Sequence, residues 1–205
     1  MARQPFDRSM EPYYERRSAE YDDWYRGAGI FEGRERPGWR TELRAVEEVL
    51  STLPPSRTVD VACGTGFLTR RLPGRVIGVD ASEGMLSESR AKHDHPLVRA
   101  DAFSLPFRTR SFDRVVTGHF YGHLHPEQRV RFLAEVRRVA PEIVVLDAAL
   151  RDDVEPEEIQ TRILNDGSSH SVFKRYLTAP QLAGELGGGR VLFEGRWFVM
   201  VESPR

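Results

Sequence analysis

The sequence predicts one doubly wound α/β domain, in which helices cover both faces of a mainly parallel sheet that finishes in an antiparallel hairpin. Its 205 residues, 40% hydrophobic and 30% charged, suit a single large domain with a substantial core. From residue 58 onward, strand candidates alternate with helical stretches. Parallel neighbouring strands need long crossover connections of this kind. Near the C-terminus, two apolar runs flank a short turn around Gly195, and such a link permits only an antiparallel pair.

The expected elements follow in chain order. Short apolar runs predict strands at residues 59–62, 75–79, 97–100, 112–117 and 143–150, and the final hairpin at 190–193 and 197–201. Helical patterns cover residues 43–53, 67–72, 82–90 and 126–139. Prolines in the interval 101–111 favour a loop.

The first 38 residues differ from the rest in being rich in tyrosine, arginine and acidic residues. Tyr14, Tyr21 and Tyr25 are spaced by seven and four residues, which is compatible with one face of a helix. We expect residues 1–38 to form a helical cap or lid, and residues 39–205 to form the main domain in one structural unit with it. The aromatic residues of the cap either stack on a flat substrate or pack against the sheet.

Composition disfavours several classes of partner. The net charge is −1, with 30 basic and 31 acidic residues, so no global positive field attracts nucleic acid or an anionic membrane. No apolar run approaches the roughly 20 residues of a membrane helix, and the polar start MARQPFDRSM lacks the apolar centre of a secretory signal. Cys63 is the only cysteine, which fits a reducing compartment. A cytoplasmic location is expected.

The stretch VDVACGTGFLTRRL has the pattern of a strand, a glycine turn and a helix. Gly64 and Gly66 allow a ligand to approach the main chain at the carboxyl end of the strand. A dinucleotide fingerprint would need a third small residue where Thr69 stands. A P-loop would need a Lys-Ser/Thr pair where Phe67 and Leu68 follow. Neither phosphate-binding motif is complete.

Charge favours a cationic nucleoside ligand. Asp60 precedes the turn and no basic residue follows before Arg70, so a pyrophosphate would be repelled. S-adenosylmethionine carries an ammonium and a sulfonium, and the N–H groups of the turn can bind its carboxylate. Asp80, twenty residues later, is placed to accept from both ribose hydroxyls. Asp101 can accept from the adenine amino group, and Met85 can contact the ring.

Four ordered motifs, VDVACGTG, VIGVDASEGML, RADAFSLPF and FDRVVTGHFYGHL, resemble those of class I S-adenosylmethionine-dependent methyltransferases of the small-molecule type. The resemblance covers roughly residues 14–201. It implies a Rossmann-like, seven-stranded sheet with a reversed seventh strand, S-adenosyl-L-methionine as cofactor, and methyl transfer to a nucleophile. One departure is RRVAPEIVV, where the family often has a Lys-Pro-Gly-Gly turn. The implied cofactor contacts are Tyr14, Tyr21, Asp60, Ala62, Gly64, Gly66, Asp80, Ser82, Met85, Asp101, Ala102 and His119.

Histidines crowd the turn after the fourth expected strand. Methyl transfer needs mainly alignment and exclusion of water, and a base helps only when the acceptor must lose a proton. His119, His123 and Tyr121 are the catalytic candidates, with His125 a weaker one. The alternative is that these side chains pack the turn and only the main chain contacts ligand.

The methyl acceptor is expected to be a small molecule with an oxygen or nitrogen nucleophile. An RNA or protein methyltransferase is the alternative enzyme, disfavoured because TGHFYG stands where an Asn/Asp-Pro-Pro-aromatic run would be expected. A protein that binds the cofactor without transferring methyl is the alternative outside enzymes. Oligomeric state and acceptor identity are not encoded in any motif.

Two further groups of residues allow both a functional and a structural interpretation. A divalent metal is suggested by three carboxylates, Asp147, Asp152 and Asp153. Because the sequence identifies no further ligands for such a site, we predict no metal. His170 and residues 174–176 either line an acceptor pocket or belong to a surface connection that packs Tyr176.

Overall fold

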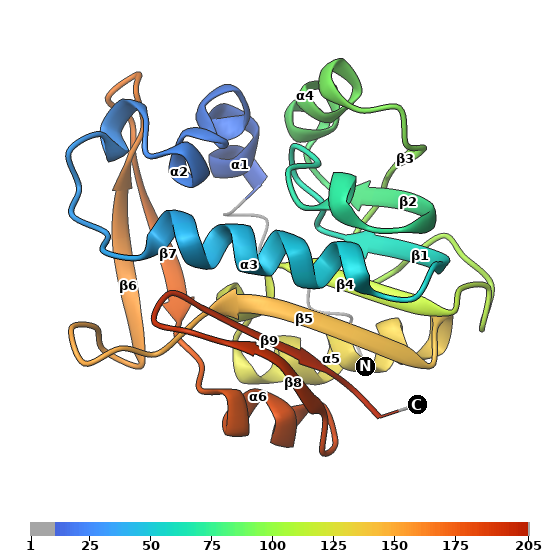
Figure 1. Cartoon of the computed structure of the whole chain (residues 1–205). Helices are drawn as coiled ribbons and strands as arrows, with labels where there is room; N and C mark the ends of the chain where they lie inside the picture. The colour runs from blue at the N-terminus through green and yellow to red at the C-terminus, as the bar shows by residue number, and fades with distance from the viewer. Residues whose placement is uncertain (1–10, 205) are drawn as a thin grey trace.

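The computed structural model describes residues 11–204, which form a central sheet with helices on both faces (Figure 1). The sheet has seven strands in the order β3-β2-β1-β4-β5-β9-β8. The strands are β1 (Ser56–Val61), β2 (Gly74–Asp80), β3 (Leu97–Arg99), β4 (Arg114–Gly118), β5 (Glu142–Ala148), β8 (Arg190–Glu194) and β9 (Phe198–Glu202). The first five are parallel, and the antiparallel β8–β9 hairpin pairs with β5 through β9. The predicted fold class is confirmed.

Successive side chains along each strand point to opposite faces of the sheet, so the core has two layers, one on each face. Val144 and Leu146 of β5 pack with α3 (Trp39–Thr52), whose buried residues recur every three or four positions. Ile143 and Val145 point to the other face, toward α5 (Pro126–Val139) and α6 (Ala179–Glu185). Both faces of β5 are therefore buried, as a parallel sheet covered on two sides requires.

The segment after the glycine turn differs from the prediction. Residues 67–72 contain only a 3-10 turn, η4 (Thr69–Arg71), where an α-helix was expected. The connection from β1 to β2 is short, because β2 already begins at Gly74, and Leu68 and Leu72 are buried in the α3 layer. α4 (Glu83–Lys92), which follows β2, is a regular helix and matches its prediction.

Residues 1–10 of the expected cap lie outside the described part of the chain, and residues 11–31 form several short helices in place of one continuous helix. They form α1 (Glu11–Arg17), η2 (Ser18–Glu20), α2 (Asp23–Arg26) and η3 (Gly29–Phe31). Gly27 ends α2 in the left-handed region, with φ 70°. Tyr25 stacks on Phe67 at 3.9 Å between ring centroids, so this segment packs directly on the glycine turn.

A second, two-stranded sheet lies outside the main one. β6 (Glu157–Ile163) and β7 (Ser169–Arg175) form an antiparallel hairpin that stands beside α1 and α2 in Figure 1. No strand is predicted between residues 150 and 190, so this hairpin is an addition to the predicted elements. Two signals were present in the sequence: alternation along β6 and an Asp-Gly pair, Asp166-Gly167, in the turn.

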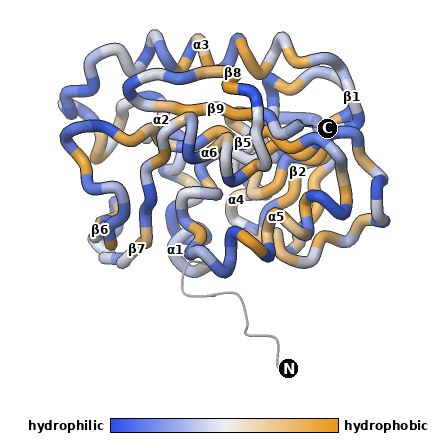
Figure 2. Tube along the Cα trace, turned by 90° about the horizontal axis from the view of Figure 1, so that it is seen from below, coloured by the Kyte–Doolittle hydropathy of each residue, from blue (hydrophilic) through white to orange (hydrophobic). Residues whose placement is uncertain are grey.

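Hydropathy along the chain follows this arrangement. Figure 2 shows hydrophobic segments along central strands such as β5 and β9, while much of the outer chain is hydrophilic. Within residues 11–204, every helix is too short or too polar to cross a lipid bilayer.

Candidate active site

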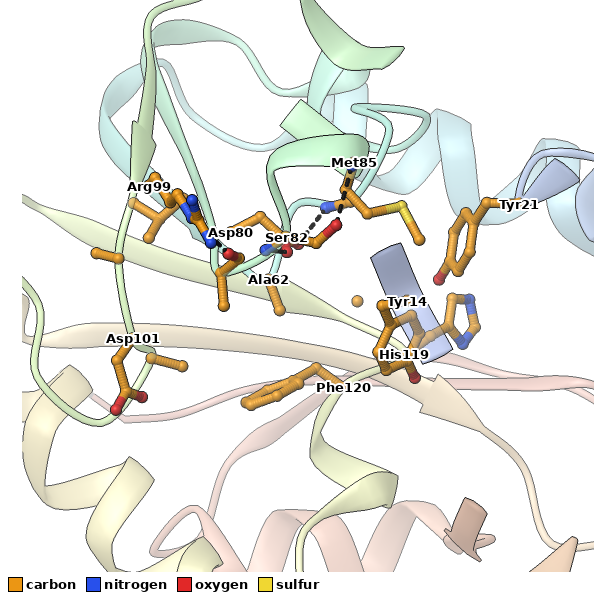
Figure 3. Close-up of a pocket in the computed structure, with 16 residues that line it drawn as sticks. Tyr14, Tyr21, Ala62, Asp80, Ser82, Met85, Arg99, Asp101, His119 and Phe120 are labelled. Atoms are coloured by element: carbon orange, nitrogen blue, oxygen red, sulfur yellow. Dashed lines mark hydrogen bonds between the residues drawn. The ribbon is translucent and has the colours of Figure 1, made fainter. Parts of the chain in front are cut away.

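A cavity of about 540 Å³ opens at the carboxyl ends of β1, β2, β3 and β4, under the N-terminal segment (Figure 3). Its volume lies in the range of small-molecule sites. Ten of the twelve cofactor contacts implied by the sequence line it: Tyr14, Tyr21, Ala62, Gly64, Asp80, Ser82, Met85, Asp101, Ala102 and His119. Arg99 and Phe120 also line this cavity and were not predicted.

Asp80 is held at the centre of the cavity wall by main-chain donors. Its Oδ2 accepts from the N–H of Gly64 at 2.8 Å, and its Oδ1 accepts from the N–H of Ser82 at 2.9 Å. Burial raises the pKa of Asp80, and these hydrogen bonds oppose that rise. Ser82 in turn caps α4, because its Oγ accepts from the N–H of Met85 at 3.1 Å (Figure 3). The carboxylate is therefore fixed before any ligand binds.

Two residues of this cavity have rare backbone conformations. Ala62, just after β1, has φ 60°, and His119, just after β4, has φ 57°. A non-glycine residue in the left-handed region costs on the order of 1–3 kcal/mol, and such residues cluster at functional sites. The only other described non-glycine residue with positive φ is Arg110. Strain in the described chain is thus concentrated where strands deliver residues to the cavity.

His119 is buried in an aromatic environment. Its ring lies 4.8 Å from that of Trp24 and 5.6 Å from that of Phe198, measured between centroids. Burial lowers the pKa of His119 to about 4, so the imidazole is neutral at pH 7. Among the described residues its Nε2 has no hydrogen-bond partner. An unpartnered polar atom beside a cavity is costly, and a ligand with polar groups would relieve that cost.

Asp60 lies behind the glycine turn, in a small pocket that shares Tyr21 and Ala62 with the main cavity. It is 3% exposed and accepts from Thr69 Oγ1 at 2.6 Å. Burial raises the pKa of Asp60 to about 7, and the hydrogen bond from Thr69 opposes the rise. No described lysine or arginine forms an ion pair with it, which leaves room for a cationic ligand.

Gly66, the other implied contact outside the main cavity, packs elsewhere. A Cβ at this position would lie 2.6 Å from Ser89 Oγ and from His93 Cδ2. The structure therefore explains this glycine by close approach to α4 and the residue after it. A cofactor contact for Gly66 stays a prediction.

A second cavity, of about 890 Å³, lies between the N-terminal segment, the start of α3 and the β6–β7 hairpin. Tyr14, Tyr21 and His119 line both cavities. Burial raises the pKa of both tyrosines, that of Tyr21 to about 12, so their hydroxyls remain protonated donors. Molecules in the two cavities would meet at these three side chains.

The other histidines of the turn after β4 have different surroundings. His123 is 7% exposed and lines the second cavity, and its Nδ1 lies 2.6 Å from the carbonyl oxygen of Phe173. Because a carbonyl only accepts, Nδ1 carries the proton and Nε2 keeps a free lone pair. Burial lowers the pKa of His123 well below its usual value. His125 is exposed at the start of α5 and stacks on Phe173.

Tyr121, the remaining catalytic candidate, lies apart from both cavities. Its hydroxyl donates to Glu185 Oε2 at 2.6 Å, and its ring belongs to the core under α5. A catalytic role for Tyr121 stays a prediction.

Of the residues considered for an acceptor pocket, Lys174 and Tyr176 line the second cavity. His170 packs near Tyr13, at 5.3 Å between ring centroids. Asp147, considered for a metal, pairs with Lys174 at 2.6 Å. In the described part of the chain, no three His, Cys, Asp or Glu side chains are grouped to hold a metal ion.

Sequence reasoning missed the side chains that attach the N-terminal segment to the site. The Glu15 carboxylate accepts from Ser82 Oγ at 2.7 Å and from the N–H of Gly84 at 2.9 Å. Asp22 accepts from Thr65 Oγ1 at 2.5 Å and from Lys92 Nζ at 3.1 Å. These contacts join residues 43 to 70 positions apart, and no local pattern indicates them.

A family model described as a methyltransferase domain matches residues 59–142. Among curated proteins, the demethylmenaquinone methyltransferase of Staphylococcus saprophyticus is 34% identical over 110 residues, which are 49% of this chain and 46% of that protein. That of Thermotoga maritima is 35% identical over 108 residues, 49% of this chain and 44% of that protein. The chain thus spans about half the length of these curated relatives.

A solved structure of a DhpI–SAM–HEP complex shares the fold over 100% of both chains, with a TM-score of 0.73 and 22% identity. The matched methyltransferase domain covers the glycine turn, the end of β2 and the turn after β4, which build most of the first cavity, whereas Tyr14 and Tyr21 come from outside the matched residues. Residues 59–142 are therefore similar to a methyltransferase domain, and the seven-stranded sheet with its antiparallel last hairpin is the fold that the sequence resemblance implied.

Proposed function

We propose that the protein transfers the methyl group of S-adenosylmethionine to an oxygen or nitrogen atom of a small molecule. The observation that carries this proposal is the meeting of two cavities at Tyr14, Tyr21 and His119. One cavity is lined by the family's cofactor positions, and the other is large enough for an acceptor. The methyltransferase names of the curated relatives, and the SAM in the DhpI complex, support it.

The first cavity offers a partner for each part of the cofactor, which when bound supplies a methyl group activated by a positive sulfur. Asp80 retains lone pairs for the ribose hydroxyls, and Asp101, which lines the same cavity, is the proposed acceptor for the adenine amino group. Met85 supplies a polarizable contact to the base. The Asp60 carboxylate, unpaired by any described basic residue, favours the cationic end of the molecule.

The N-terminal segment excludes water from the reacting atoms. Glu15 and Asp22 hold it against α4 and the glycine turn, and Tyr14 and Tyr21 reach from it into both cavities. Alignment and exclusion of water supply much of the rate of a displacement at an activated carbon. We therefore assign residues 11–31 the role of a lid in this reaction.

His123 is the proposed base for acceptors that must lose a proton. Its Nδ1 is committed to the carbonyl of Phe173, so the free Nε2 can accept a proton in the second cavity. His119 is the second candidate, because it lines both cavities. The reaction would take place in the cytoplasm, where the one thiol, Cys63, stays reduced.

The test begins with calorimetry of S-adenosylmethionine, NAD and ATP, followed by transfer of labelled methyl to small phenols, amines and carboxylates, with bulk RNA and protein as competing acceptors. We expect selective binding of S-adenosylmethionine and labelling of a small molecule. Retention of NAD or ATP in its place would refute the proposal. Preferential labelling of RNA or protein would favour a macromolecular substrate, and binding without any product would indicate a binding protein.

The base is tested separately with His123→Asn, whose amide can still donate to the carbonyl of Phe173. We expect kcat to fall by about 10²-fold or more while cofactor affinity is retained. His125→Asn is the matched control, because His125 is exposed and asparagine also caps helices well. Unchanged turnover in His123→Asn would exclude His123 as the base.

A further inference from the structure

We infer that the methyl acceptor carries a negatively charged group, a carboxylate or a phosphoryl group, which binds to Arg17 and Arg162 in the second cavity. This inference rests on the proposed function and adds the charge of the substrate to it. It comes from the charges that line the cavity and from what those charges contact.

The two arginines converge on one phenol. Arg17 Nη1 donates to the Tyr13 hydroxyl at 2.5 Å, and Arg162 Nη1 donates to the same oxygen at 3.2 Å. Arg17 comes from α1 and Arg162 from β6, so the lid and the hairpin each contribute one guanidinium. All three residues line the second cavity. Their side chains form a preorganised group of donors at its wall.

Neither arginine has a carboxylate partner among the described residues. The other contacts of Arg162 are two hydrogen bonds to the amide oxygen of Gln160, at 2.9 and 3.2 Å. Arg17 is only 6% exposed and otherwise lies over aromatic rings, including that of Tyr21 at 4.9 Å. A buried guanidinium surrounded by neutral groups is costly, and an anionic ligand offsets that cost.

The remaining charges of the cavity do not supply this anion. Its lining includes six basic residues, Arg17, Arg34, Arg36, Arg151, Arg162 and Lys174, and two acidic ones, Glu35 and Glu158. Lys174 pairs with Asp147 and Arg151 pairs with Asp153, so these two cations are already compensated. Glu158 accepts instead from the amide of Gln160 at 2.8 Å. The remaining positive charge is therefore on Arg17 of the lid, on Arg162 of β6, and on Arg34 and Arg36, which follow the lid.

The position of the pair suits an acceptor. The guanidinium of Arg17 lies over Tyr21, and Tyr21 lines both cavities. An anion bound here would place the rest of a small molecule near the junction with the cofactor cavity. Guanidinium groups match the oxygens of carboxylates and phosphoryl groups in geometry as well as in charge.

The first experiment measures anion binding directly. Protein saturated with S-adenosylhomocysteine is titrated with acetate and, separately, with inorganic phosphate, while NMR follows the arginine Nε–H signals. We expect the signals of Arg17 and Arg162 to shift, and the anion with the higher affinity distinguishes a carboxylate from a phosphoryl ligand. Arg17→Gln and Arg162→Gln should weaken binding by about tenfold or more. Arg17→Lys and Arg162→Lys keep the positive charge, so they should retain more anion affinity than the corresponding Gln variants.

Arg16→Gln is the matched control, because Arg16 lies beside Arg17 on α1 and its side chain is 60% exposed. Thermal melting of each variant shows whether it folds. Equal anion affinity in the wild type, Arg17→Gln and Arg162→Gln would overturn the inference, and so would the absence of any shift at either arginine. Failure to bind S-adenosylhomocysteine would instead refute the proposed function, so the two failures are distinguishable.

The second experiment measures methyl transfer to pairs of acceptors that differ only in charge, such as 4-hydroxybenzoate and 4-hydroxybenzamide. In the same assays, phenyl phosphate is added as a competitor of the acceptor. We expect anionic members of such pairs to be preferred, and Arg17→Gln and Arg162→Gln to raise their KM by about tenfold. Consistent preference for the neutral member would overturn the inference. If no member of the panel is methylated, the binding experiment decides alone.

Discussion

Lys174 of β7 and Asp147 of β5 form a salt bridge at 2.6 Å, with side chains that are 7% and 0% exposed. Burial alone would raise the pKa of Asp147, but Lys174 lowers it to about 2. The second Asp147 oxygen accepts from the N–H of Gly122 at 2.7 Å. One buried ion pair thus joins the hairpin to the main sheet and to the turn that carries His123.

Lys174→Met should lower the free energy of unfolding by about 3–5 kcal/mol, because it leaves the buried Asp147 without its cation. Urea denaturation followed by circular dichroism measures the change. The double variant Lys174→Met/Asp147→Asn removes both charges and should recover part of the loss. A loss below about 1 kcal/mol in the single variant would contradict this account of the pair.

Asp60 should couple binding of S-adenosylmethionine to release of a proton. Its pKa of about 7 means that much of it is protonated near neutral pH, and a cationic ligand favours the ionised form. Cofactor affinity should therefore fall as the pH falls below 7. Calorimetry in buffers of different ionisation enthalpy measures the released proton. Asp60→Asn should abolish the dependence, and S-adenosylhomocysteine, which lacks the sulfonium charge, should show a weaker one.

Two buried groups, His119 and Asp60, should make opposite contributions to the pH dependence of stability. The pKa of His119 is lowered from 6.5 to about 4, so its contribution is present above pH 6.5 and is lost as the pH falls. The pKa of Asp60 is raised from 3.8 to about 7, so its contribution is present at low pH and is lost as the pH rises. Each changes the free energy of unfolding by about 2 kcal/mol between pH 4.5 and 6.5.

Single variants should separate these contributions. Asp60→Asn removes the group that is stabilising at low pH, so on acidification from about pH 6.5 to 4.5 it should lose more stability than the wild type. His119→Asn removes the opposite contribution, so over the same range its stability should change in the other direction relative to the wild type. Denaturation at several pH values measures both slopes. Parallel slopes in the two variants would show that these residues do not dominate the pH dependence.

Gly66→Ala should destabilise the protein by about 2 kcal/mol or more, because of backbone strain and a clash. Gly66 has φ 77°, and the added Cβ would lie 2.6 Å from Ser89 Oγ. Gly184→Ala is the matched control. Gly184 lies within α6 with open space around it, so alanine should stabilise the helix by about 0.5–1 kcal/mol. Thermal melting that ranks the two variants in the opposite order would contradict this interpretation.

Local patterns in the sequence were sufficient for most of the main sheet. α5 begins at Pro126 and ends at Val139, as predicted, because a proline at its first position and amphipathic spacing mark both its start and its buried face. The pattern was misleading at residues 67–72, where apolar residues at helical spacing are buried by the layer above them without forming a helix. It was also insufficient at β6, whose Ile159 and Ile163 are exposed and indicate no core.

The sequence by itself determined which strands follow one another and which residues stand at their ends around the first cavity, because each motif is covalently attached to the strand that delivers it. Only the tertiary structure decided what surrounds those positions. Arg162 and Tyr13 are 149 residues apart, and no periodicity indicates that they meet. The pKa of Asp60 likewise depends on burial by neighbouring segments. Contacts and electrostatic environments of this kind arise from packing between distant parts of the chain, whereas sequence patterns report mainly local geometry.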